Sequence, residues 1–160
     1  MEEVFYERKG VLVKLTSTRG RKRVRGSAGS YKREKQLSEA IVEAVIEASS
    51  SDSGRSEVKN CELDTISVTL CTLDSIDEVE PEHHDEIEIG KHGVIVEKGR
   101  KDGWMLPTMP VERGWKTQEF LDRTCCKAGL DRRAWAEDDG VKIYAFEGQI
   151  FEEEEPSGNV

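Results

Sequence analysis

The chain has 160 residues, of which 36% are apolar and 36% charged, and its formal net charge is −9. This length suits one domain with a buried core, and the clustering of the apolar residues into periodic segments excludes a disordered chain. No apolar run reaches the roughly 18 residues of a membrane span, and the N-terminus lacks a signal-peptide pattern, so we expect a cytoplasmic protein that does not cross a membrane.

The charge is distributed unevenly along the chain. Residues 1–36 contain eleven lysines and arginines against four glutamates, a balance of +7, which leaves −16 for the remainder. This first part includes the basic run Arg19-Gly-Arg-Lys-Arg23. Because a globally acidic protein repels nucleic acid at long range, any contact with RNA would be local to this run.

The first half of the chain predicts two strands followed by a helix. Strands are expected at 10–15 and 23–25, joined by a polar hairpin loop that carries the basic run. Residues Gly26-Ser-Ala-Gly-Ser30 then predict a glycine-rich turn. Apolar residues spaced by three and four predict a helix over 37–48, and a polar, Ser-rich connection follows at 49–60.

The second half predicts mostly strands. Residues 66–73 alternate with the period of a half-buried strand, and the acidic segment 74–88 is interpreted as a solvated loop that leads to a short strand near Ile87 and Ile89. The remaining expected elements are a hairpin over 93–98 and 104–107, a helix over 117–128 ended by Gly129, a short turn that contains Trp135, a strand over 141–151 and an acidic tail over 152–160.

The histidines and cysteines match no template of a metal site. His83 and His84 lie near Asp85, Glu88 and His92, but the spacing is not that of a known site, and adjacent residues of an extended chain point to opposite faces. The four cysteines include no CxxC pair. We therefore predict no metal and no cofactor.

Four segments of the sequence together resemble one protein family. They are Val24-Arg-Gly-Ser-Ala-Gly-Ser30, Ile89-Gly-Lys-His-Gly-Val94, Leu106-Pro-Thr-Met-Pro-Val-Glu-Arg-Gly-Trp115, and Cys125-Cys-Lys-Ala-Gly-Leu130 followed by Trp135. This combination resembles the AMMECR-type domain, named for the Alport syndrome, midface hypoplasia and elliptocytosis chromosomal region. Its microbial members are protein A of the AmmeMemoRadiSam system. The similarity covers residues 10–48 and 62–151.

The resemblance implies an α/β (α+β) fold, in which an antiparallel or mixed sheet with flanking helices forms two subdomains of unequal size that face a cleft. On this chain we expect the larger subdomain at 1–48 and 85–151, with a reduced small subdomain or connection within 49–84. The resemblance implies no settled activity. It does imply action together with a Memo-like protein and a radical S-adenosylmethionine enzyme.

The family signature has the form Leu-Arg-Gly-Cys-Ile-Gly and reads Val24-Arg-Gly-Ser-Ala-Gly29 in this chain, so a serine stands where relatives carry a cysteine. A glycine-rich turn before a helix can offer backbone N–H groups to an anion, and an arginine adds a bidentate donor. We therefore predict a site for a small anionic ligand, bearing phosphate or carboxylate, at the signature turn: Arg25, Gly26, Ser27, Gly29 and Ser30.

Two further residues of the family segments are candidates for catalysis. His92 can contact a ligand or transfer a proton, and Glu112 can act as a general base or hold Arg25 in place. Each also has a structural interpretation, as a hydrogen-bonded histidine and as a surface carboxylate. The sequence leaves open whether the domain is an enzyme, and the alternative is an RNA-binding or protein-interaction module without catalysis.

Overall fold

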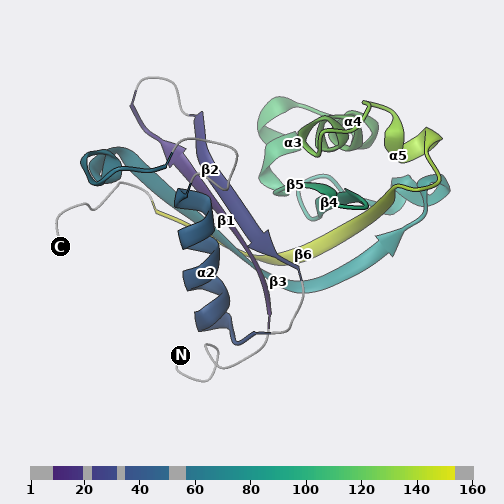
Figure 1. Ribbon diagram of the computed structural model, residues 1–160. Helices are drawn as coiled ribbons and strands as arrows, with labels where there is room; N and C mark the ends of the chain where they lie inside the picture. The colour runs from purple at the N-terminus through teal and green to yellow at the C-terminus, as the bar shows by residue number, and fades with distance from the viewer. Residues whose placement is uncertain (1–8, 20–22, 32–34, 51–56, 154–160) are drawn as a thin grey trace. The chain divides into compact units, whose positions relative to one another are not determined.

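The computed structural model describes residues 9–19, 23–31, 35–50 and 57–153 (Figure 1). Its elements in chain order are β1 (Gly10–Ser17), β2 (Arg23–Ser30), α2 (Leu37–Ser49), η2 (Asn60–Thr65), β3 (Ile66–Val79), η3 (Pro81–Glu86), β4 (Gly93–Lys98), β5 (Lys101–Met105), α3 (Thr108–Arg113), α4 (Thr117–Lys127), α5 (Ala134–Glu137) and β6 (Lys142–Glu152). No helix within these described ranges combines the length and the apolar character needed to cross a membrane.

The strands form a six-stranded sheet in the order β2-β1-β3-β6-β4-β5. β1 pairs antiparallel with β2 and β3, and β4 pairs antiparallel with β5 and β6. Helices flank this sheet, so the expected α+β fold with an antiparallel sheet is confirmed.

The chain divides into two compact units. The first contains the described residues up to Asp74 together with those from Gly148 onward, and the second contains Ser75–Glu147. β3 and β6 each contribute residues to both units. The boundaries of these units lie after Asp74 and Glu147. The expected subdomains, at 1–48 with 85–151 and within 49–84, stay a prediction.

In the first unit, α2 packs against β1 and β2 (Figure 1). Its buried residues recur every three or four positions, which is the pattern that predicts an amphipathic helix. β1 contributes every second residue to the same core, so the residues between them lie on the opposite face of the sheet. The core residues are Val11, Val13, Leu15, Ala28, Leu37, Ala40, Ala44, Ala48 and Ile66.

In the second unit, α4 packs against β4 and β5. Among the buried side chains of this unit is a carboxylate, that of Asp122, which is 6% exposed. It accepts hydrogen bonds from the indole N–H of Trp135 at 2.7 Å and from Nε of Arg132 at 3.2 Å. A buried charge is tolerated when it is paired and hydrogen-bonded, so we assign Asp122 a structural role.

Several predicted elements differ from the observed ones. β3 continues to Val79 and η3 follows it, so the segment 74–88 is not a solvated loop, and Ile87 and Ile89 form no strand. Pro81 begins η3 because its fixed φ suits the first position of a helix. β2 extends to Ser30, five residues beyond its predicted end.

Candidate functional site

The family signature is a strand in the structure. β2 pairs with β1 so that Gly26 lies opposite Leu15 and Ser30 lies opposite Val11. The predicted glycine-rich turn is therefore wrong. Glycine within a strand also marks a place where another part of the chain approaches closely, and this is the situation in β2.

Packing accounts for both glycines of the signature. A Cβ atom on Gly26 would lie 1.9 Å from the carbonyl oxygen of Ala48, near the end of α2. A Cβ atom on Gly29 would lie 2.5 Å from Cδ2 of Leu12. Contacts of real Cβ atoms are much longer, so both positions exclude a larger residue. These glycines are therefore explained by contacts inside the first unit, without a bound anion.

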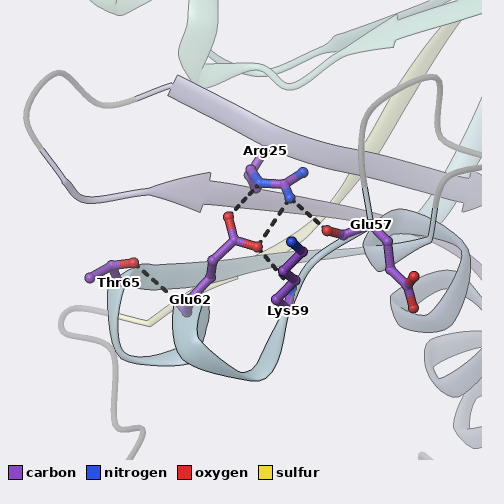
Figure 2. Close-up of polar contacts among 5 residues, drawn as sticks. All are labelled: Arg25, Glu57, Lys59, Glu62 and Thr65. Atoms are coloured by element: carbon purple, nitrogen blue, oxygen red, sulfur yellow. Dashed lines mark hydrogen bonds and ion pairs between the residues drawn. The ribbon is translucent and has the colours of Figure 1, made fainter.

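A β-bulge occurs near the start of the signature. Leu15 pairs with Gly26 and Thr16 pairs with Val24, which leaves Arg25 as an extra residue on β2. A bulge breaks the regular alternation of a strand and can aim one side chain toward the other face. Here it directs Arg25 toward η2, on the α2 side of the sheet (Figure 2).

Arg25 is engaged by carboxylate and carbonyl oxygens. Its Nε and Nη2 each donate to one carboxylate oxygen of Glu62, both at 3.1 Å, and Nη2 also donates to the carbonyl oxygen of Glu57 at 2.9 Å (Figure 2). The arginine side chain is 10% exposed. Its carboxylate partner is thus Glu62, and not Glu112 as expected from the sequence.

Glu62 is held by two neighbours. The pKa of its carboxyl is lowered, first by the hydrogen bond from Arg25 and then by the backbone N–H of Lys59, which donates to Oε2 at 2.8 Å. The hydroxyl of Thr65 donates to the carbonyl oxygen of Glu62 at 2.9 Å and closes the same turn of η2 (Figure 2). The ion pair therefore fixes Arg25 to a short, internally bonded segment.

Ser27 is the signature residue that this packing does not explain. It lies opposite Lys14 of β1, and Lys14 lies opposite Thr69 of β3. Val13 and Leu15 belong to the core beneath α2, so these three polar residues lie on the other face of the sheet. Side chains directly opposite each other on neighbouring strands have Cβ atoms about 5 Å apart. The register therefore places an amine and two hydroxyls in one row.

The charge of Lys14 has no counterpart in that row. With the residues that the structure describes, Lys14 forms neither a hydrogen bond nor an ion pair, and Ser27 forms no side-chain hydrogen bond. Both residues are half-buried, and Thr69 is 5% exposed. A half-buried amine without a partner favours the approach of an anion.

His92 has a structural environment. Gly90 adopts a φ of 91°, and the turn around it brings Nδ1 of His92 to the backbone N–H of Glu88, which donates to it at 2.9 Å. Nε2 lies 3.2 Å from Oε1 of Glu147 and donates to that carboxylate. Both ring nitrogens are thereby used within the second unit, so the geometry gives no support to proton transfer by His92.

The other candidate residues are not drawn together. Glu112 lies exposed on α3 and contacts none of the described residues through a hydrogen bond or an ion pair. His83 is exposed, whereas Nδ1 of His84 donates to the carbonyl oxygen of Pro81 at 2.8 Å. No three His, Cys, Asp or Glu side chains in the described ranges are placed to hold a metal ion. The cysteines are unpaired: Cys61, Cys71, Cys125 and Cys126.

Some predictions concern residues outside the described ranges. Residues 20–22 of the basic run lie there, as do 51–56 of the Ser-rich connection and 154–160 of the acidic tail. Local contact of the basic run with RNA therefore stays a prediction.

Comparison with known proteins identifies the family. The family model AMMECR1 matches residues 1–151. The chain belongs to the AMMECR1 family. Two similar proteins are VNG_2543C of Halobacterium salinarum, 44% identical over 96% of this chain and 75% of the relative, and MJ0810 of Methanocaldococcus jannaschii, 41% identical over 99% of this chain and 80% of the relative.

A solved structure of similar fold is that of the uncharacterized protein PH0010 from Pyrococcus horikoshii. Its crystal structure superposes with a TM-score of 0.84 and 36% sequence identity, covering 98% of this chain and 79% of that chain. The AMMECR1 fold of this chain is therefore supported by a crystal structure of a relative.

Sequence reasoning missed Lys14 as a site residue of this AMMECR1 domain. A signal was present, since Lys14 is the one charged residue in the otherwise apolar segment Gly10-Val-Leu-Val-Lys-Leu15. Because side chains alternate along a strand, the side chain of Lys14 lies on the opposite face from those of Val13 and Leu15. What the sequence did not supply was the register, which decides that Lys14 meets Ser27.

Proposed function

We propose that this AMMECR1-family domain binds a small anionic ligand, bearing a phosphate or carboxylate group, at Lys14, Ser27 and Thr69. The observation that carries the proposal is the register of β1 with its two neighbours, which aligns these residues in one row. The predicted ligand class and the involvement of Ser27 are kept, but the cation is Lys14 in place of Arg25.

The chemistry of the row suits an oxyanion. An ammonium group supplies a compact positive charge with three donors, and each hydroxyl can add a neutral hydrogen bond. Because the lysine is half-buried, its attraction to an anion is less screened than that of an exposed lysine. The serine at the position where relatives carry cysteine serves this purpose as a donor, without the need for a reactive thiol.

The proposal is one of binding. His92 and Glu112 belong to the second unit, and neither is used here. Glycines 26 and 29 shape β2 through close packing and contribute no hydrogen bond to the ligand. Cooperation with a Memo-like protein and a radical S-adenosylmethionine enzyme, and a cytoplasmic location, stay predictions.

Titration of the full chain with inorganic phosphate and with acetate, followed by NMR chemical-shift changes, tests this proposal. Lys14→Ala should weaken the binding of the preferred anion at least about tenfold, because it removes the charged donor. Ser27→Ala should weaken binding by roughly threefold, since it removes one neutral donor. The resonances that shift should include those of residues 14, 27 and 69.

A control lysine separates a site from a general effect of charge. Lys142 is exposed on β6, and its side chain forms no hydrogen bond or ion pair with the described residues, so Lys142→Ala changes the net charge equally without touching the row. Lys142→Ala should leave the affinity unchanged, and Lys14→Arg should retain most of it. Equal affinities for Lys14→Ala and Lys142→Ala would refute the proposed site.

A further inference from the structure

The proposed site leaves the signature arginine unused, although its chemistry matches the ligand. A guanidinium group binds carboxylate and phosphate oxygens in the same bidentate geometry. In the structure a carboxylate of the chain itself takes this place, because Arg25 donates hydrogen bonds to both carboxylate oxygens of Glu62 (Figure 2). Glu62 therefore stands where an external oxyanion could bind.

The bulge decides on which face Arg25 lies. In a regular strand residues two apart share a face, so Arg25 would lie on the face of Ser27. The extra residue removes this alternation between Val24 and Gly26, and Arg25 turns to the α2 side instead. Without the bulge, Arg25 would lie opposite Thr16 and diagonal to Lys14.

Only a small part of β2 would need to move for that change. Two residue pairs, Thr16 with Val24 and Ser17 with Arg23, lie between the bulge and the end of the ladder. The pairs on the other side are held in register, because Gly26 lies against Ala48 and admits no larger residue. Shifting the first two pairs by one residue removes the bulge while Ser27 stays opposite Lys14.

We propose that Glu62 competes with the anionic ligand for Arg25, and that Arg25 joins Lys14 on the ligand face when this ion pair opens. The inference rests on the proposed function, because it assumes an anion at Lys14 and Ser27. Cross-strand diagonal neighbours are about 7–8 Å apart, which long side chains such as lysine and arginine span. The ligand would then be bound by the two cations Arg25 and Lys14, and competition from Glu62 would lower the affinity of the domain for the ligand.

Removal of the competing carboxylate tests the inference. Glu62→Gln should tighten the binding of inorganic phosphate at least about fivefold relative to the unmodified chain, because the variant lacks the negative charge that competes with the ligand for Arg25. The gain should disappear in the double variant Arg25→Met/Glu62→Gln. Arg25→Met alone should change the affinity less than twofold, because Glu62 already withholds this arginine.

The matched control is Glu57→Gln. It removes one negative charge close to Arg25 but keeps the backbone carbonyl that Arg25 contacts. If Glu62→Gln gained no more affinity than Glu57→Gln, or lost affinity, the competition would be disproved and the ion pair would be structural only. Failure of Lys14→Ala to weaken phosphate binding would instead refute the proposed function, so the two results are distinguishable. Melting temperatures of all variants establish that each is folded at the temperature of the titration.

Discussion

The signature strand of the first unit and the Gly90 turn of the second unit are both family segments, and they use their charged residues in similar ways. In β2, Arg25 is held by Glu62, and in the turn, His92 is held by Glu147 and the N–H of Glu88. The residues that looked most like ligand contacts are thus the ones bonded internally.

The two segments differ in the polar side chains that internal hydrogen bonds and ion pairs leave available. β2 leaves Ser27 opposite Lys14, which forms no ion pair with the part of the chain that the structure describes. The second segment uses both nitrogens of His92 and pairs Lys91 with Glu147 at 3.2 Å. We infer that the turn serves the fold of its unit and that β2 combines a structural face with a face available to a ligand. The comparison teaches that the residues of a family motif have to be sorted by the face of the sheet on which each lies before a function is assigned to them.

The largest effect is expected where a motif residue contacts backbone. Gly26→Ala would bring Cβ to 1.9 Å from the carbonyl oxygen of Ala48, and backbone at the end of α2 has to move to relieve this clash. We expect a loss of about 3 kcal/mol or more in the free energy of unfolding, measured by urea denaturation.

Gly93→Ala offers the corresponding test in the second unit. Its Cβ would lie 2.0 Å from Cζ of Phe146, a fully buried side chain that has to repack, whereas Gly26→Ala clashes with backbone, so the expected loss is smaller, about 1–3 kcal/mol. A Gly26→Ala variant as stable as the unmodified chain would contradict the packing explanation of the signature.

Local pattern predicted much of this fold. The helices over 37–48 and 117–128 could be predicted because the spacing of their apolar residues is regular. Gly129, with a φ of 79°, ends the second helix as expected. The extension of β2 through Gly26 and Gly29 could not be predicted, because local propensity favours a turn there. Only the contacts with Ala48 and Leu12, distant in sequence, make these glycines suitable for a strand.

The candidate site was less predictable than the fold, for a related reason. Arg25 and Ser27 could be selected from the signature, but Arg25 lies at a bulge and pairs with Glu62, which is 37 residues away. Lys14 joins Ser27 only through strand register. Periodicity gives the face of a residue, whereas its partner across the sheet is fixed by the tertiary structure.

An intermediate effect is expected in the turn of the second unit. His92→Ala removes the acceptor of the Glu88 N–H and the donor to Glu147, so we expect a loss of roughly 1–2 kcal/mol in the free energy of unfolding. Anion affinity in the same protein should be unchanged. His83→Ala is the control, because His83 is exposed and its substitution should cost less than about 0.5 kcal/mol. A loss of anion binding in His92→Ala would contradict the inference that the Gly90 turn serves only the fold of its unit.

The smallest effect concerns the pH dependence of the Arg25–Glu62 ion pair. Because the pKa of Glu62 is lowered in the folded chain from its ordinary value of 4.5, the carboxylate stabilises the fold above that pH, and this contribution is lost as the pH falls through the lowered value. The melting temperature of the unmodified chain should therefore exceed that of Glu62→Gln at pH 7, and the two should converge as the solution is acidified from pH 5 toward pH 3. The comparison with Glu57→Gln removes the contribution of net charge, since that variant loses the same charge but not the ion pair. A difference that stayed constant or grew on acidification would show that Glu62 stabilises the fold through packing and not through its charge.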